Sequence, residues 1–338
     1  MKVSDYDYKL PLSLIAQRPL DKRSESKLMV LNRSNKTISH RKFEDIVNYF
    51  GPNDVLVINN SKVLPARLQG IKEDTFAHIE ILLLKEIEKD IWEVLVKPQR
   101  RVKVGTIVKF SDELKIKITK VKDKGICQGQ LIYQGILIEI LERLGEMPLP
   151  PYIKEKITDN DRYQTVYAKE LGSAAAPTAG FHFTDDLLNK LKLKGVTIIE
   201  ITLHVGLGTF RPVDVEIVEE HEMHAETYYI DKESANLLNQ ALKEGKKITA
   251  VGTTSVRTLE SNYNNGFTSG LFETNIFIYP GYQFQVVDHL ITNFHLPKSS
   301  LVMLVSAFYN KDEILKSYQV AIDKNYRFFS FGDAMLIY

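Results

Sequence analysis

The pattern of apolar and polar positions divides the chain into a β-rich stretch and a stretch in which helices and strands alternate. Short runs rich in β-branched residues, separated by turn signals, recur at 66–71, 77–84, 92–97, 106–110, 114–121 and 126–133. Six short strands at this spacing are typical of a small antiparallel barrel or sandwich. A helix is predicted at 136–144, and the proline-rich segment 145–152 after it excludes both helix and central strand.

After this segment, predicted helices alternate with predicted strands. Helices are predicted at 184–194, 232–244 and 256–262, and strands at 196–203, 248–251 and 274–278. Such alternation favours an α/β domain with a mostly parallel sheet. The fully apolar run 54–58 resembles these strands although it precedes the β-rich stretch. We therefore expect a large α/β domain formed by 1–65 and 150–338, interrupted by a small antiparallel β-barrel domain at 66–149.

Composition narrows the class of protein. The 338 residues are 44% hydrophobic and 26% charged, as in ordinary folded domains. The first residues are polar and no stretch approaches the roughly 20 apolar residues of a membrane span, so we expect a cytoplasmic protein. A net charge of +1 gives no strong long-range field, so contact with a polyanion requires a local patch. The lone Cys127 is interpreted as a structural thiol.

Two segments rich in glycine and alanine, 172–183 and 204–212, hold the most unusual residue combinations in the chain. Small residues let a backbone approach a ligand closely, and His182, His204 and Arg211 stand among them, where they can act on that ligand. His204 also follows a predicted strand, and open α/β sheets bind ligands at the carboxyl ends of their strands.

Each segment has a plainer explanation as well. The first fits a close-packed loop with Phe181 and Phe183 in the core and His182 hydrogen-bonded, as well as a site where one aromatic ring stacks on a flat ligand. In the second, Gly206 and Gly208 lack the third glycine of a dinucleotide fingerprint, so we reject a Rossmann site.

A strand, a tight turn and a helix are predicted across 248–257. The turn, 252–255, reads Gly-Thr-Thr-Ser, and a helix start with free N–H groups and hydroxyls can bind a carboxylate or phosphate. Helix capping explains the hydroxyl residues equally well. Capping does not require the neighbouring Arg257, whose forked guanidinium matches a carboxylate.

Segment 221–226 contains two histidines and two glutamates, so a metal site must be considered. The spacing of His221 and His224 differs from the metalloprotease pattern, and the segment runs into strand-like residues 227–230. A metal site, polar residues of an active site and a hydrogen-bonded surface cluster all remain open. Basic residues at 97–103 form either a solvated face or a phosphate contact.

These segments also carry a family resemblance over nearly the whole chain. The chain resembles the QueA family, the S-adenosylmethionine:tRNA ribosyltransferase-isomerases of queuosine biosynthesis. The matching stretches are 5–11, 14–19, 57–68, 174–183, 204–213, 221–224, 251–261, 277–282, 292–298 and 326–335.

The resemblance implies transfer and isomerisation of the ribosyl group of S-adenosylmethionine onto 7-aminomethyl-7-deazaguanine at the wobble position of tRNA. The products are epoxyqueuosine in the tRNA, adenine and methionine. It also implies that S-adenosylmethionine is a consumed substrate, that there is no cofactor or metal, and that the partners are a tRNA anticodon loop and no membrane. A monomer is the expected state.

In that reaction the sulfonium acidifies the C5′ hydrogens, so a base with a near-neutral pKa is needed. The departing adenine develops negative charge, which an acid or hydrogen-bond donors must neutralise. The catalytic candidates are His182, His204, His224 and Arg211, the last steadying ribose hydroxyls or a phosphate. The candidates for binding S-adenosylmethionine are Ala175, Pro177, Thr178, Phe181, Gly206, Gly208, Thr209, Gly252, Thr253, Thr254, Ser255 and Arg257. The tRNA candidates are Lys97, Arg100, Arg101, Lys103 and Lys298.

Two rival functions remain at this stage. A metal-dependent hydrolase would use His221 and His224 with a carboxylate. A non-enzymatic RNA-binding protein would use the barrel as its RNA module.

Overall fold

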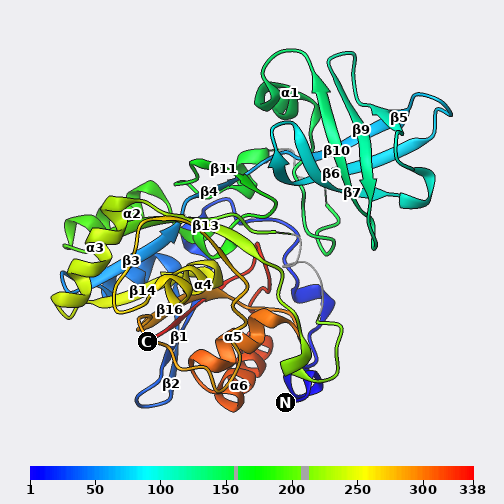
Figure 1. Ribbon diagram of the computed structural model, residues 1–338. Coiled ribbons are helices and arrows are strands. Elements are labelled where there is room, and N and C mark those ends of the chain that lie inside the picture. Colours follow the sequence, from blue (N-terminus) through cyan, green and yellow to red (C-terminus); the bar gives the residue numbers. More distant parts are fainter. Residues whose placement is uncertain (156–158, 207–212) are drawn as a thin grey trace. The chain divides into compact units, whose positions relative to one another are not determined.

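The computed structural model describes residues 1–155, 159–206 and 213–338, which form two compact units (Figure 1). The larger unit comprises Met1–Ser61, Pro151–Glu170 and Ala176–Tyr338, and the smaller comprises Lys62–Pro150 and Leu171–Ala175. Relative to the division expected from the sequence, 171–175 joins the smaller unit, because strand β11 (Glu170–Ser173) pairs with β4 (Ser61–Val63). No helix within the described ranges is long and apolar enough to span a membrane.

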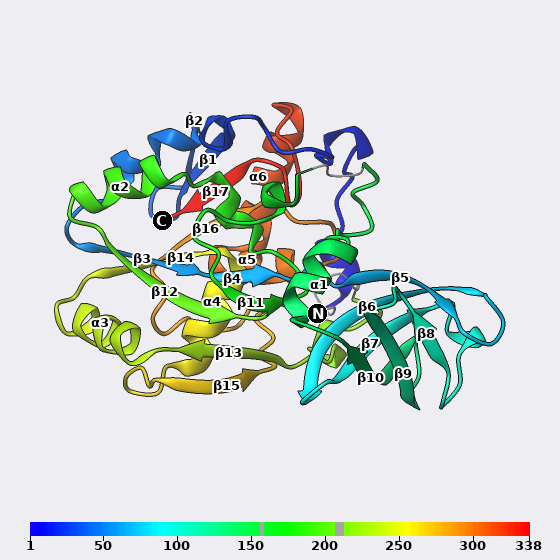
Figure 2. The ribbon, with the colours of Figure 1, turned by 90° about the horizontal axis from the view of Figure 1, so that it is seen from above.

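The smaller unit is a closed six-stranded barrel in the order β10-β7-β6-β5-β8-β9, with all pairs antiparallel (Figure 2). Apolar and polar residues alternate along the strands, as expected when one face of a strand is buried inside a barrel. For example, Leu114, Ile116 and Ile118 are buried, whereas the lysines between them are not. The elements are β5 (Arg67–Lys72), β6 (His78–Glu88), β7 (Ile91–Lys97), β8 (Ile107–Lys109), β9 (Leu114–Val121), β10 (Ile126–Tyr133) and helix α1 (Leu137–Leu144).

The larger unit is built on a nine-stranded sheet in the order β15-β13-β12-β3-β14-β16-β17-β1-β2. Its four middle strands, β12, β3, β14 and β16, are parallel, whereas most pairs outside them are antiparallel. The predicted α/β class with an inserted barrel is confirmed, and the parallel part is the middle of a mixed sheet. The strands are β1 (Lys27–Asn32), β2 (Thr37–Lys42), β3 (Asp54–Asn59), β12 (Thr197–Leu203), β13 (Glu226–Ile230), β14 (Lys247–Val251), β15 (Gly270–Thr274), β16 (His289–Asn293) and β17 (Ala334–Ile337).

The helices of this unit are α2 (Asp185–Leu193), α3 (Lys232–Lys243), α4 (Gly252–Asn262), α5 (Ser300–Phe308) and α6 (Lys311–Asp323), with short 3-10 helices η4 (Phe43–Tyr49) and η7 (Thr178–His182). The strand predicted at 274–278 is wrong: β15 ends at Thr274, and the apolar residues after it line a hollow beside α4 instead. Helix α4 starts at Gly252, so the predicted turn is its first turn.

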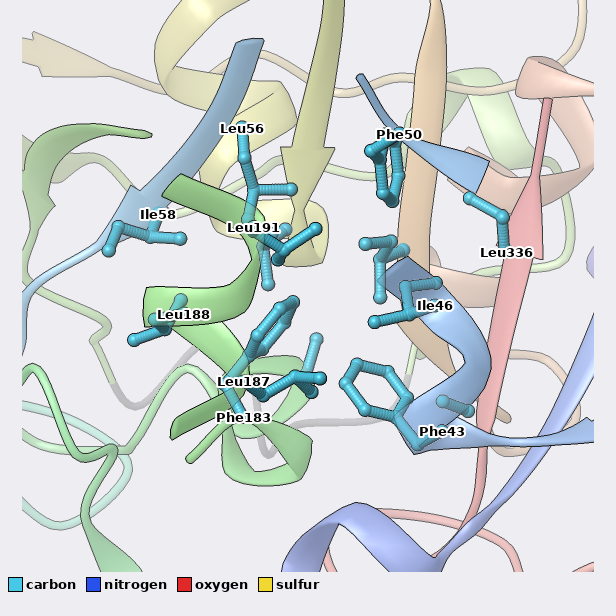
Figure 3. Packing of buried hydrophobic residues seen from close by; sticks show 14 of the residues in the cluster. Phe43, Ile46, Phe50, Leu56, Ile58, Phe183, Leu187, Leu188, Leu191 and Leu336 are labelled. Atoms are coloured by element: carbon cyan, nitrogen blue, oxygen red, sulfur yellow. The ribbon is translucent and has the colours of Figure 1, made fainter. Parts of the chain in front are cut away.

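One face of the sheet is covered by α2 and η4 (Figure 3). Helix α2 buries Leu187, Leu188 and Leu191, and the Thr184 hydroxyl caps it by accepting from the Leu187 N–H at 3.2 Å. Phe183, just before the helix, meets the ring of Phe43 edge-on at a centroid distance of 4.9 Å. This anchoring fixes η7, which carries the residues of the first small-residue segment.

The position of Gly180 in η7 generates a test of this packing. A Cβ atom there would overlap the Tyr167 hydroxyl and would lie 2.8 Å from Thr165 Cγ2. Gly180→Ala should therefore lower the free energy of unfolding by about 1–3 kcal/mol, the usual effect of overpacking. Gly51→Ala is the control, because no described atom lies within 4 Å of its added Cβ. Equal urea midpoints for the two variants would contradict the close approach.

Candidate active site

The carboxyl ends of the parallel strands meet at one edge of the sheet, with polar residues at or close to each end. The ends are Asn59, Leu203, Val251 and Asn293. Asn59 ties two of them together, because its side-chain amide donates to Leu203 O and accepts from Leu203 N, both at 3.0 Å. Ligands of open α/β sheets bind at such an edge.

His182 is held at this edge by both ring nitrogens. Its Nδ1 lies 2.8 Å from Ser26 Oγ, and its Nε2 lies 3.1 Å from Asn293 Nδ2. Since that amide nitrogen donates, Nε2 accepts and Nδ1–H donates to the serine, which defines a neutral tautomer. Burial lowers the pKa of His182 to about 3, and the charges of Arg327 and Arg23 add to the effect. The imidazole is therefore neutral, and both of its nitrogens are hydrogen-bonded.

His204 differs from His182 because one of its ring nitrogens has no hydrogen-bond partner within the ranges that the structure describes. It directly follows β12, and its backbone N–H donates to Thr227 O at 3.0 Å. Its Nδ1 is buried and has no hydrogen-bond partner among the described residues. Burial lowers the pKa of His204 below its ordinary value, and Glu170 opposes this shift. The ring is therefore neutral near pH 7 and can exchange a proton with a ligand.

A buried ion pair joins β13 to α4. Arg257 Nη1 contacts Glu226 Oε2, and the two side chains are only 8% and 4% exposed. Glu226 Oε1 accepts from Gly206 N at 2.9 Å, and Arg257 Nε donates to Ile276 O at 3.3 Å. Arg257 Nη2 is buried with no hydrogen-bond partner in the described part of the chain. The pair therefore leaves one charged donor for a further acceptor.

This donor belongs to a hollow between β13, α4 and α5. Its walls are Met223, Glu226, Thr253, Thr254, Arg257, Ile276, Phe277, Ile278, Ser300, Leu301 and Leu304. The Thr254 hydroxyl is also buried without a partner within the described ranges. An unpaired buried polar group costs about 1–3 kcal/mol, so two in one mostly apolar hollow favour a ligand that pairs with them.

The first small-residue segment meets the same edge through Thr178 and Ala179. Thr178 Oγ1 donates to Asn293 Oδ1 at 3.1 Å, which links it through that amide to His182. A Cβ atom on Gly252 would lie 3.4 Å from the Ala179 Cβ, so η7 packs directly on the junction of β14 and α4. The structure therefore brings together Thr178, Gly252, Thr253, Thr254 and Arg257.

Other predicted residues have structural contacts instead. Ser255 Oγ donates to Val251 O, four residues earlier, at 2.8 Å, so this hydroxyl is used within α4, which has no side-chain N-cap. The ring of Phe181 stacks on Phe331 at 5.8 Å, and Ala175 and Pro177 are buried. Gly208, Thr209 and Arg211 lie outside the described residues.

The two histidines of segment 221–226 differ in their surroundings. The His221 ring packs on Phe277 at 5.2 Å, whereas His224 is exposed. In the ranges that the structure describes, no three His, Cys, Asp or Glu side chains lie close enough to hold a metal ion.

The predicted tRNA residues fall in both units. Lys97, Arg100, Arg101 and Lys103 are exposed on the smaller unit. Lys298 is in the larger unit, where its Nζ lies 2.6 Å from Asp7, so its charge is already compensated.

Sequence reasoning missed three residues that the fold adds to the edge. Glu226 was noted only as a member of the histidine segment, and Asn293 only as part of the matching stretch 292–298. Ser26 had no sequence signal, because its contact with His182 joins residues far apart in the chain.

Comparisons with known proteins identify the family of the chain. The family model described as queuosine biosynthesis protein matches residues 3–337. A solved structure described as an S-adenosylmethionine tRNA ribosyltransferase from Thermotoga maritima is 38% identical, with a TM-score of 0.58, and the match covers 99% of this chain and 100% of that chain. The chain therefore belongs to the family of queuosine biosynthesis proteins.

Proposed function

We propose that the chain is an S-adenosylmethionine:tRNA ribosyltransferase-isomerase. It transfers and isomerises the ribosyl group of S-adenosylmethionine onto 7-aminomethyl-7-deazaguanine at the wobble position of tRNA, giving epoxyqueuosine, adenine and methionine. Family membership and the function printed for the Thermotoga maritima relative support this reaction. The structural observation that carries it is the hollow with two unpaired buried polar atoms at Thr254 and Arg257. S-adenosylmethionine is consumed, and the protein acts as a cytoplasmic monomer without a cofactor or metal.

The charges of the hollow match the methionine end of the donor. This end carries a carboxylate, an ammonium and a neighbouring sulfonium. Arg257 Nη2 is a charged donor for the carboxylate, and Glu226 supplies negative charge next to it for the cationic groups. The side chains of Ile276, Leu301 and Leu304 cover the methylene groups.

His204 is the base in this account. Its neutral imidazole accepts a C5′ proton that the adjacent sulfonium has made acidic, which leaves an ylide-like carbanion. His182 acts as a positioning residue, because both of its nitrogens are already bonded and its contact with Asn293 orients Thr178. A metal-dependent hydrolase based on His221 and His224 is not supported by the family membership, and neither is a non-enzymatic RNA-binding protein.

The direct test is release of adenine from S-adenosylmethionine. Purified protein should release adenine and methionine together only when the tRNA carries 7-aminomethyl-7-deazaguanine, and tRNA with unmodified guanine is the control. Chromatography measures the released adenine and methionine, and nucleoside analysis of the tRNA measures the epoxyqueuosine formed. Release without tRNA, or none with the precursor tRNA, would contradict the proposal.

Thr254→Val removes a hydroxyl without changing the shape of the side chain. Since that hydroxyl is buried and unpaired in the free protein, stability should stay constant or rise by up to about 1 kcal/mol. The KM for S-adenosylmethionine should rise about fivefold to tenfold, as expected when a ligand loses one hydrogen bond. Thr258→Val is the matched control, because its hydroxyl is also buried and unpaired among the described residues but does not line the hollow. An equal KM for both variants would remove Thr254 from the site.

The proposed base generates a pH prediction. Because the pKa of His204 is lowered, its neutral form is present at pH 7 and is lost only as the pH falls below the ordinary histidine value of about 6.5. Single-turnover transfer should therefore show an acid limb below pH 6.5. His204→Gln should slow transfer by about 10²- to 10⁴-fold and abolish that limb. A near-normal rate with the limb intact would exclude His204 as the base.

A further inference from the structure

A second hollow opens at the same edge of the sheet, where β1 and β17 begin. Leu28 and Asn293 are both in register with Ala334, so the starts of these two strands lie beside the carboxyl end of β16. We call this hollow the arginine pocket; its walls include Arg23, Arg162, Arg327, Phe181, Ser330 and Phe331. All of these residues belong to the larger unit.

Two of the three arginines are held by backbone carbonyl groups. Arg23 donates to Gln164 O at 2.6 Å and to Asp161 O at 2.9 Å. Arg162 donates to Leu20 O and, at 3.4 Å, to Asp21 O. Carbonyl groups fix the direction of a guanidinium but bring no net charge, and neither arginine has an ion-pair partner among the described residues.

Carboxylates near the pocket offset part of its positive charge. Arg327 forms an ion pair with the buried Asp333 at 2.9 Å and so adds little positive charge. Burial lowers the pKa of Arg23 and the nearby charge of Arg162 lowers it further, whereas the carboxylates of Asp159 and Asp161 oppose this shift. The described residues that line the pocket thus include three arginines and no aspartate or glutamate.

The pocket also has an aromatic wall. The rings of Phe181 and Phe331 stack at 5.8 Å with an interplanar angle of 21°, and the Arg23 guanidinium lies 5.5 Å from the centroid of Phe181. This stack holds Arg23 in place, so its donors need little ordering when an anion arrives.

We propose that the arginine pocket binds a backbone phosphate of the RNA substrate beside the reacting nucleotide. The inference rests on the proposed function, which supplies RNA as the substrate. S-adenosylmethionine is a net cation, since its one carboxylate stands against an ammonium and a sulfonium, so this pocket repels it. A phosphodiester is a net anion that forked guanidinium groups recognise well. The charge-balanced hollow at Glu226 and Arg257 suits the sulfonium substrate instead.

Charge removal tests the proposal with a matched control. Arg23→Gln and Arg162→Gln should each weaken tRNA binding about fivefold to tenfold, and the slope of log K against log salt should fall by about 0.7 per residue. The KM for S-adenosylmethionine at saturating tRNA should stay within about twofold. Arg33→Gln is the control: Arg33 donates to Phe308 O at 3.2 Å and lies 4.5 Å over that ring, but it follows the opposite end of β1. It should leave both values unchanged.

A measurement on the wild-type protein tests the proposal even when the variants fail to fold. Phenylglyoxal labelling followed by mass spectrometry reports on each arginine separately. Precursor tRNA should protect Arg23 and Arg162 but not Arg33, whereas S-adenosylmethionine alone and inorganic phosphate at about 1 mM should protect neither. Protection by S-adenosylmethionine alone, or equal labelling with and without tRNA, would overturn the proposal. In either case normal adenine release would leave the proposed function standing.

Discussion

The parallel pairing of β12, β3, β14 and β16 is the constraint on which the site depends. Parallel strands require crossover connections, and their carboxyl ends therefore meet at one edge, however far apart they lie in the sequence. His204, the start of α4 and Asn293 all come from these ends. The hydrophobic core under α2 and η4 holds the short helix η7 against the same edge. The same core therefore positions both η7 and the strand ends.

Charge balance then separates two hollows along this edge. In one, Glu226 and Arg257 neutralise each other while a guanidinium nitrogen remains unpaired among the described residues. In the other, backbone carbonyls orient Arg23 and Arg162, and the described lining contains three arginines and no carboxylate. A sulfonium donor and a polyanionic acceptor need opposite electrostatic surroundings, and the two hollows provide them without any change in fold. His182 is neutral, and both of its ring nitrogens are hydrogen-bonded.

The sequence predicted elements whose pattern is local. The barrel strands and α2 follow from alternation and from helical spacing, which the chain shows over a few residues. The local pattern does not predict strands β1, β2, β16 and β17 or helices α5 and α6, and it predicts a strand after Thr274 because burial in a hollow leaves the same apolar signature. The small-residue segments indicated where a ligand binds. The pairing of Glu226 with Arg257, and of Ser26 with His182, depends on tertiary contacts that no spacing encodes.

The central claim is that the methionine end of S-adenosylmethionine binds beside the Glu226 and Arg257 pair. A crystal structure with S-adenosylhomocysteine, which keeps the same carboxylate and ammonium, tests it most directly. The account predicts the ligand carboxylate within hydrogen-bond distance of Arg257 Nη2 and of the Thr254 hydroxyl. A ligand in the arginine pocket, or at the opposite edge beside Arg33, with Arg257 Nη2 still unpaired, would contradict it.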